Sequence, residues 1–165
     1  MRLRISATNQ KGVTFIELIV TVSILVILSA LVLPVAKFSV QRQKELELRR
    51  ALREIRDGID AYHEAAMPTT PGTVAKIQVK FGTDGWPPDL KTLVDGETMI
   101  GDVNGKKIHF LRRIPIDPMT NSTEWVLRST QDDPDSTSWG GENVWDVHTK
   151  STALALDGNT HYNEW

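Results

Sequence analysis

Glu17 has the most unusual chemical setting in this chain. It is the only charged residue between Lys11 and Lys37, and it stands at the start of a long apolar run. A carboxylate at the centre of a membrane helix costs roughly 2.5–3.5 kcal/mol on insertion scales, and less near a helix end. Two explanations are open. Glu17 lies in the lipid headgroup layer, or it pairs with an opposite charge that another group supplies.

Two acidic segments near the other end of the chain could supply oxygen ligands to a hard cation such as calcium. The first contains Asp132, Asp133, Asp135 and Glu142, and the second is centred on Asp157. A solvated acidic loop that binds no metal is the simpler alternative. We therefore carry forward calcium as a hypothesis, with four aspartates as its candidate ligands: Asp132, Asp133, Asp135 and Asp157.

We find no catalytic constellation in the sequence. The chain has no cysteine, and its four histidines are scattered without the spacing of a metal site. No P-loop, nucleophile elbow or dinucleotide fingerprint is present. Residues 117–165 contain nine acids but only Arg128 and Lys150 as cations, a balance that argues against binding to nucleic acid. The sequence therefore predicts a protein that is not an enzyme.

The apolar run from Leu18 to Ala36 is nineteen residues long and carries no charge. About 20 apolar residues are needed to cross the core of a bilayer as a helix. A secretory signal peptide and a plain single-pass anchor both fit, although the run is longer than a usual signal core and no A-x-A site follows it. Pro34 removes one helical hydrogen bond, so we expect a bend there.

The helical pattern continues beyond the apolar run. Five apolar residues recur at alternating spacings of four and three, which places them on one face of a helix: Leu48, Leu52, Ile55, Ile59 and Tyr62. Apart from Pro34, no strong breaker lies between Val13 and Ala66. The sequence therefore predicts one long, bent helix of about 50 residues, whose second part lays its stripe on a globular domain.

The segment that follows is expected to form an α+β domain. Residues 74–81 alternate as a strand does, and residues 91–94 follow a turn as one helical turn. Three further strands are predicted at residues 125–129, 144–148 and 160–165. We expect these strands to form a small antiparallel sheet packed on the apolar stripe of the long helix.

The residues around Glu17 carry a resemblance to a known family. Lys11-Gly12 followed by VTFIELIVTVSILVIL resembles the leader junction of type IV pilins and type II secretion pseudopilins. The resemblance implies that a prepilin peptidase cuts between Gly12 and Val13 and N-methylates Val13. Glu17 is then the fifth mature residue, as in the family, and Pro34 the twenty-second. Val13 stands where the family usually has phenylalanine.

This resemblance implies an organisation for the whole chain. Residues 1–12 would be a cleaved leader, 13–36 the transmembrane part of the helix, 37–66 its amphipathic part, and 67–165 a periplasmic domain. The chain would be a single-pass protein of the bacterial inner membrane with a cytoplasmic N-terminus. In a homo-oligomeric filament, Glu17 of one subunit would pair with the terminal amine of its neighbour and set the register of assembly.

A second segment, FLRRIPIDP at residues 110–118, resembles a stretch of G-type major pseudopilins. It implies a periplasmic pseudopilus that drives type II protein secretion, with other pseudopilins and an inner-membrane assembly platform as partners. G-type pseudopilins bind calcium in a C-terminal loop, of which only Leu156-Asp157-Gly158 is similar here. A surface pilus subunit for adhesion, motility or DNA uptake and a non-polymerising, membrane-anchored binding domain remain as alternatives.

Overall fold

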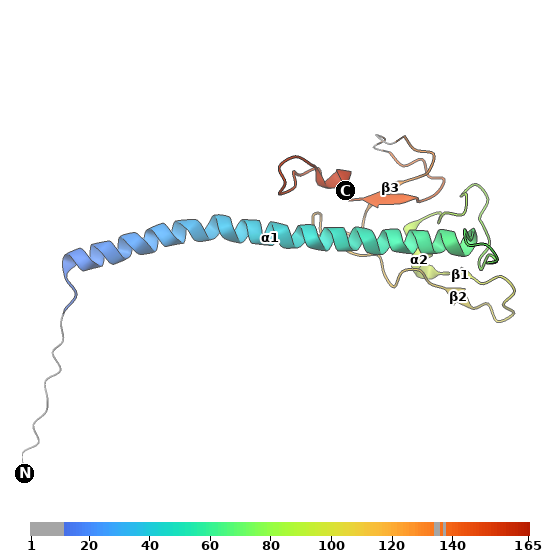
Figure 1. Ribbon diagram of the computed structural model, residues 1–165, viewed down its shortest axis with the longest axis horizontal. Coiled ribbons are helices and arrows are strands. Elements are labelled where there is room, and N and C mark those ends of the chain that lie inside the picture. Colours follow the sequence, from blue (N-terminus) through green and yellow to red (C-terminus); the bar gives the residue numbers. More distant parts are fainter. Residues whose placement is uncertain (1–11, 134–135, 137) are drawn as a thin grey trace, which may run out of the picture. The chain divides into compact units, whose positions relative to one another are not determined.

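The structure is a computed structural model that describes residues 12–133, 136 and 138–165. Two α-helices come first, α1 (Phe15–Ala66) and α2 (Leu90–Asp95). Four short strands follow: β1 (Glu97–Thr98), β2 (Lys107–Ile108), β3 (Val126–Arg128) and β4 (Asp146–His148). The last element is a 3-10 helix, η1 (Tyr162–Glu164) (Figure 1).

The long helix predicted from the sequence is confirmed. α1 runs for 52 residues without interruption, and it curves within its first half (Figure 1). Thr14 precedes it as an N-cap, because its Oγ1 accepts a hydrogen bond from the backbone N–H of Glu17 at 3.3 Å. The helix continues through position 34, but the side chain of Pro34 lies outside the described residues. A kink caused by Pro34 therefore stays a prediction.

The chain divides into two compact units, which meet in sequence between Val40 and Gln41. We call residues 15–40 the apolar half of α1 and residues 41–66 its amphipathic half. In the apolar half, every side chain that the structure describes is exposed. The amphipathic half belongs to the second unit and supplies one wall of that unit's hydrophobic core.

The predicted apolar stripe is the centre of this core. All five of its residues are at most 2% exposed. Gly58 lies between two of them and lets the segment after β2 approach closely, since a Cβ added there would lie 3.0 Å from Leu111 Cδ1. The core residues outside α1 come from every part of the second unit: Ile77, Leu90, Leu93, Leu111, Trp125, Val144, Val147, Ala155 and Tyr162.

The four strands form two separate antiparallel pairs and not one sheet. β1 pairs with β2, with Glu97 opposite Ile108. β3 pairs with β4, with Val126 opposite His148 and Arg128 opposite Asp146. In the view of Figure 1, β3 lies on one side of the amphipathic half, and β1 and β2 lie on the other. The predicted α+β class, a long helix with small antiparallel sheets, is confirmed.

The strand predictions for residues 74–81 and 160–165 are wrong. Residues 74–81 form only an isolated bridge between Ile77 and Met99. The reason is that the backbone N–H groups of Lys76 and Ile77 donate to Ala65 O at 2.8 and 3.3 Å, so the segment satisfies a free carbonyl at the end of α1. β1 and β2 were missed because each has two residues and carries no strand-like alternation.

Residues 160–165 are also not a strand. After a bridge between His161 and Leu154, the chain turns into η1. The Glu164 carboxylate accepts the backbone N–H of His161 at 3.1 Å, and this capping contact favours a helical turn over an extended strand. The helical turn predicted at residues 91–94 is confirmed as α2, which Asp89 caps through the backbone N–H of Thr92 at 2.6 Å.

Candidate processing and assembly site

The predicted cleavage junction lies just outside α1. Gly12, Val13 and Thr14 have no helical structure and are exposed. A Cβ placed on Gly12 would meet no atom within 4 Å, so the junction is open on that side as well. A peptidase needs an accessible peptide bond that is not held in helical hydrogen bonds, and the Gly12–Val13 bond meets both conditions. Lys11 lies outside the described residues.

Glu17 lies in the first turn of α1, five residues after Gly12. Its side chain is exposed, and the described residues include no cation within 4.0 Å of its carboxylate. Negative charge in a first turn is favoured by the helix dipole, typically by about 0.3–1 kcal/mol. The structure thus places Glu17 next to the predicted cleavage junction, with no cation of the described residues beside its carboxylate.

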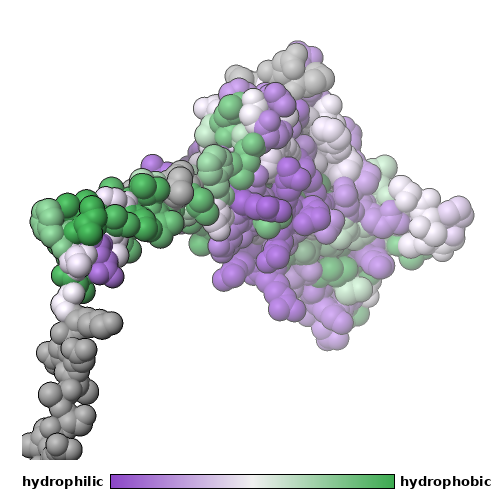
Figure 2. Space-filling view, turned by 60° about the vertical axis from the view of Figure 1, so that its left-hand side comes forward, coloured by the Kyte–Doolittle hydropathy of each residue, from purple (hydrophilic) through white to green (hydrophobic). Residues whose placement is uncertain are grey.

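The surface behind Glu17 is hydrophobic on all sides. The large apolar side chains of the apolar half are between 45% and 79% exposed. Figure 2 shows them gathered along this part of α1, whereas hydrophilic residues dominate the visible surface of the second unit. The helix is long and apolar enough to cross a membrane. Its hydroxyl groups are compatible with a membrane environment, because they bond within the helix: Thr21 donates to Leu18 O at 2.9 Å and Ser23 to Ile19 O at 2.7 Å.

The first acidic loop, between β3 and β4, uses its carboxylates to hold its own backbone. Asp132 accepts the backbone N–H of Ser129 at 2.7 Å and that of Gly140 at 3.0 Å. A Cβ on Gly140 would clash with Glu142 Oε2 and would lie 2.8 Å from Asp132 Oδ1, so these two carboxylates approach the same side of Gly140. Asp135 lies outside the described residues.

The second acidic loop is a separate turn. Asp157 accepts hydrogen bonds from Thr160 Oγ1 at 2.7 Å and from the backbone N–H groups of Asn159 and Thr160. These bonds, that of the Thr160 hydroxyl first, lower the pKa of Asp157 to about 2.

The described part of the chain holds no group of three or more histidine, aspartate or glutamate residues suited to a metal ion. Asp132, Asp133 and Asp157 are therefore not brought into one ligand set, and calcium binding stays a prediction. Its test is the melting temperature of the protein with and without millimolar calcium, with Asp133→Asn, which removes an exposed candidate ligand, as the variant in which a rise should be reduced. An unchanged melting temperature would end the calcium hypothesis.

Sequence reasoning missed the role of Asp117, which lies in the FLRRIPIDP segment. Its carboxylate is fully buried and accepts hydrogen bonds from Met119 N at 2.8 Å, from Thr120 Oγ1 at 2.9 Å and from Thr149 Oγ1. The Asp-Pro pair was the available signal, because an aspartate before proline often starts a turn. Asp117 thus fixes the turn of this segment and ties it to the strand-end residue Thr149.

Comparison with known proteins agrees with the N-terminal geometry. Residues 7–33 match the family described as the prokaryotic N-terminal methylation motif. No curated protein and no solved structure matches the chain. The match covers the cleavage junction, Glu17 and most of the apolar half. The chain therefore carries a type IV pilin-like prepilin signal, which implies processing by a prepilin peptidase and, in general, oligomerisation as a pilin.

Proposed function

We propose that this chain is the major pseudopilin of a type II secretion system, a structural subunit with no catalytic activity of its own. One observation carries the proposal: an apolar half whose described side chains are all exposed follows directly on an accessible junction with a prepilin-like motif. A surface of this kind must be covered by lipid or by copies of itself. The resemblance of residues 110–118 to G-type pseudopilins supports secretion as the role of the assembled filament.

Processing prepares the chain for assembly. Hydrolysis adds water across the Gly12–Val13 bond, which leaves a carboxylate on Gly12 and a new α-amine on Val13. Methylation of Val13 would keep that amine cationic. The amine then lies four residues before Glu17, and both groups are at the start of the same apolar helix.

Assembly follows from these two charges. When apolar halves pack side by side, Glu17 of one subunit pairs with the Val13 amine of a neighbour. A shifted register would leave a carboxylate unpaired in an apolar environment, which is costly, so the pairing selects one register. Before assembly the apolar half anchors the chain in the inner membrane, with the N-terminus cytoplasmic and the second unit periplasmic. The prepilin peptidase, other pseudopilins and the inner-membrane assembly platform are the expected partners.

The decisive experiment replaces Glu17 by alanine in cells that contain the peptidase and the secretion machinery. We expect normal cleavage, shown by mass spectrometry as a mature chain that begins at Val13, but loss of filaments in electron micrographs. Glu54→Ala is the matched control, because it removes an exposed glutamate from the same helix in its amphipathic half. The control should assemble as the wild type does.

The alternatives give different results in the same experiment. An uncleaved wild-type chain in cells with the peptidase would reject the pilin-like function altogether. Unchanged function of Glu17→Ala would favour a membrane-anchored domain that does not polymerise. Fibres displayed outside the cell at native expression levels would favour a surface pilus subunit, whereas filaments seen only on overexpression favour a pseudopilin.

A further inference from the structure

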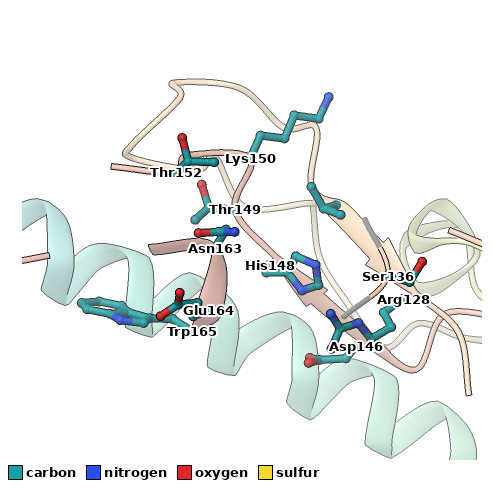
Figure 3. Close-up of a pocket in the computed structure, with 11 residues that line it drawn as sticks. Arg128, Ser136, Asp146, His148, Thr149, Lys150, Thr152, Asn163, Glu164 and Trp165 are labelled. Atoms are coloured by element: carbon teal, nitrogen blue, oxygen red, sulfur yellow. The ribbon is translucent and has the colours of Figure 1, made fainter. Parts of the chain in front are cut away.

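A cavity of about 510 Å³ lies beside the β3–β4 pair, and the end of the chain closes one side of it. Its size is within the range of small-molecule sites, roughly 300–1,000 Å³. Val126 and Trp165 give it apolar walls, while charged side chains from β3, β4 and η1 line the rest. Figure 3 shows His148 between two groups of side chains. Arg128 and Asp146 lie on one side, and residues 163–165 lie on the other. The cavity belongs wholly to the second unit and is separate from the processing site.

Two groups in this cavity have no partner among the residues that the structure describes. His148 is only 9% exposed, yet no hydrogen bond of its ring is found there. Arg128 lies on β3, which pairs with the strand of His148. No carboxylate of the described residues lies within 4.0 Å of its guanidinium group. The ring nitrogens of His148 are not among the buried unpaired atoms of the described residues, and Arg128 is half-buried, so both groups are accessible from the cavity and can donate to a ligand in it.

The two acids that line the cavity are not hydrogen-bonded to His148 or Arg128, because they accept hydrogen bonds from other groups. Asp146 receives Arg56 through both oxygens, at 2.6 and 3.3 Å. The Glu164 carboxylate accepts the backbone N–H of His161 at 3.1 Å. Lys150 is also engaged, since its ammonium group lies 2.7 Å from Glu124, and Figure 3 shows its side chain extending away from His148. Among the charged and titratable groups that line the cavity, Arg128 and His148 remain as available donors.

We propose that this cavity binds a carboxylate group, with the guanidinium of Arg128 and the imidazole of His148 as its hydrogen-bond donors. A guanidinium fork matches the two oxygens of a carboxylate. Asp146 and Glu164 line the same cavity, and their charge disfavours a dianion such as phosphate. Val126 and Trp165 can pack against a small apolar body that carries the carboxylate. The site is separate from the processing and assembly site around Glu17 and goes beyond the proposed function.

A bound carboxylate would change the titration of His148. Burial, together with the positive charges of Arg128 and Arg56, lowers the pKa of His148, while Asp146 acts in the opposite direction. The other charged groups that line the cavity are Lys150 and Glu164. A carboxylate beside the ring favours the imidazolium form, so ligand binding should raise the pKa of His148, by about one unit for an opposite charge in close contact.

The test measures the pKa of His148 by NMR in the full chain, held in detergent micelles. Acetate and N-acetylglutamate are the probes, and chloride at the same ionic strength is the reference. We expect both carboxylates to raise the pKa of His148 and Arg128→Gln to abolish the rise. Arg112→Gln is the matched control, because Arg112 is an exposed arginine that does not line the cavity.

A second arm separates the sources of the carboxylate. The pKa of His148 is measured in assembled filaments without any added carboxylate. A rise there that Arg128→Gln removes identifies the acidic side chain of a neighbouring copy as the ligand, and a rise only with the free probes identifies a small molecule. An unchanged pKa of His148 in both arms, or a rise that persists in Arg128→Gln, overturns the proposal.

Discussion

The apolar and amphipathic halves of α1 are parts of one continuous helix, but they use their hydrophobic side chains in opposite ways. The apolar half leaves every described side chain exposed, whereas the amphipathic half buries its stripe completely. The cause is the distribution of residues around the helix. Hydrophobic residues on all sides cannot be covered by a single small domain, while one stripe can. The first half therefore needs lipid or other subunits, and the second half is satisfied within its own chain.

This comparison predicts that equal truncations in the two halves have unequal effects on folding. Ile59→Ala in the amphipathic half should destabilise the second unit by about 2–5 kcal/mol, because it leaves a cavity at a fully buried position. Val26→Ala removes apolar surface from the apolar half, where the side chain is 62% exposed, and should leave the unfolding of the second unit unchanged. Thermal unfolding of the full chain in micelles compares the two variants. Equal losses would show that the halves do not differ as described.

A smaller effect is expected for Arg56, which connects the amphipathic half to β4 and to the end of the chain. Besides its ion pair with Asp146, it donates to Val147 O at 3.2 Å and to Trp165 O at 2.6 Å. Its side chain is 37% exposed, so solvent weakens these contacts. Arg56→Ala should cost about 1–2 kcal/mol in chemical unfolding. Arg50→Ala, an exposed arginine of the same helix, should cost almost nothing, and an equal cost would refute the connecting role of Arg56.

The smallest predicted effect is a pH dependence that only the second unit shows. Because the pKa of His148 is lowered on folding, the unfolded chain binds a proton more readily as the pH falls below about 6.5. Stability is thus fully present above that pH and is lost as the pH falls toward the folded pKa. Unfolding free energies between pH 7.5 and 5.5, in a buffer without carboxylates, should show this decline. His148→Gln should reduce it, and an unaltered slope would assign the decline to other groups.

Much of the N-terminal half of the chain was predictable from local pattern. The helix from Phe15 to Ala66, its buried stripe and the position of Glu17 in the first turn, beside the predicted cleavage junction, all follow from local residue spacing. Helical periodicity is local, so the sequence alone displays it. The short strands were harder to predict. Pairs of two or three residues are set by contacts between distant segments, as where residues 76–77 bond to the end of α1 and do not form a strand.

The sequence by itself determined the parts of this protein that depend on order along the chain: the prepilin-like motif with its predicted cleavage junction, the glutamate at a fixed distance from that junction, and the long helix that follows it. Only the tertiary structure decided which polar groups meet across the chain. Asp117 is buried because Met119, Thr120 and Thr149 surround its carboxylate. Arg128 and His148 share a cavity because β3 and β4 pair in an antiparallel register, although seventeen residues separate the two strands in sequence. Residue spacing does not predict these contacts, because they form between segments that are far apart in sequence.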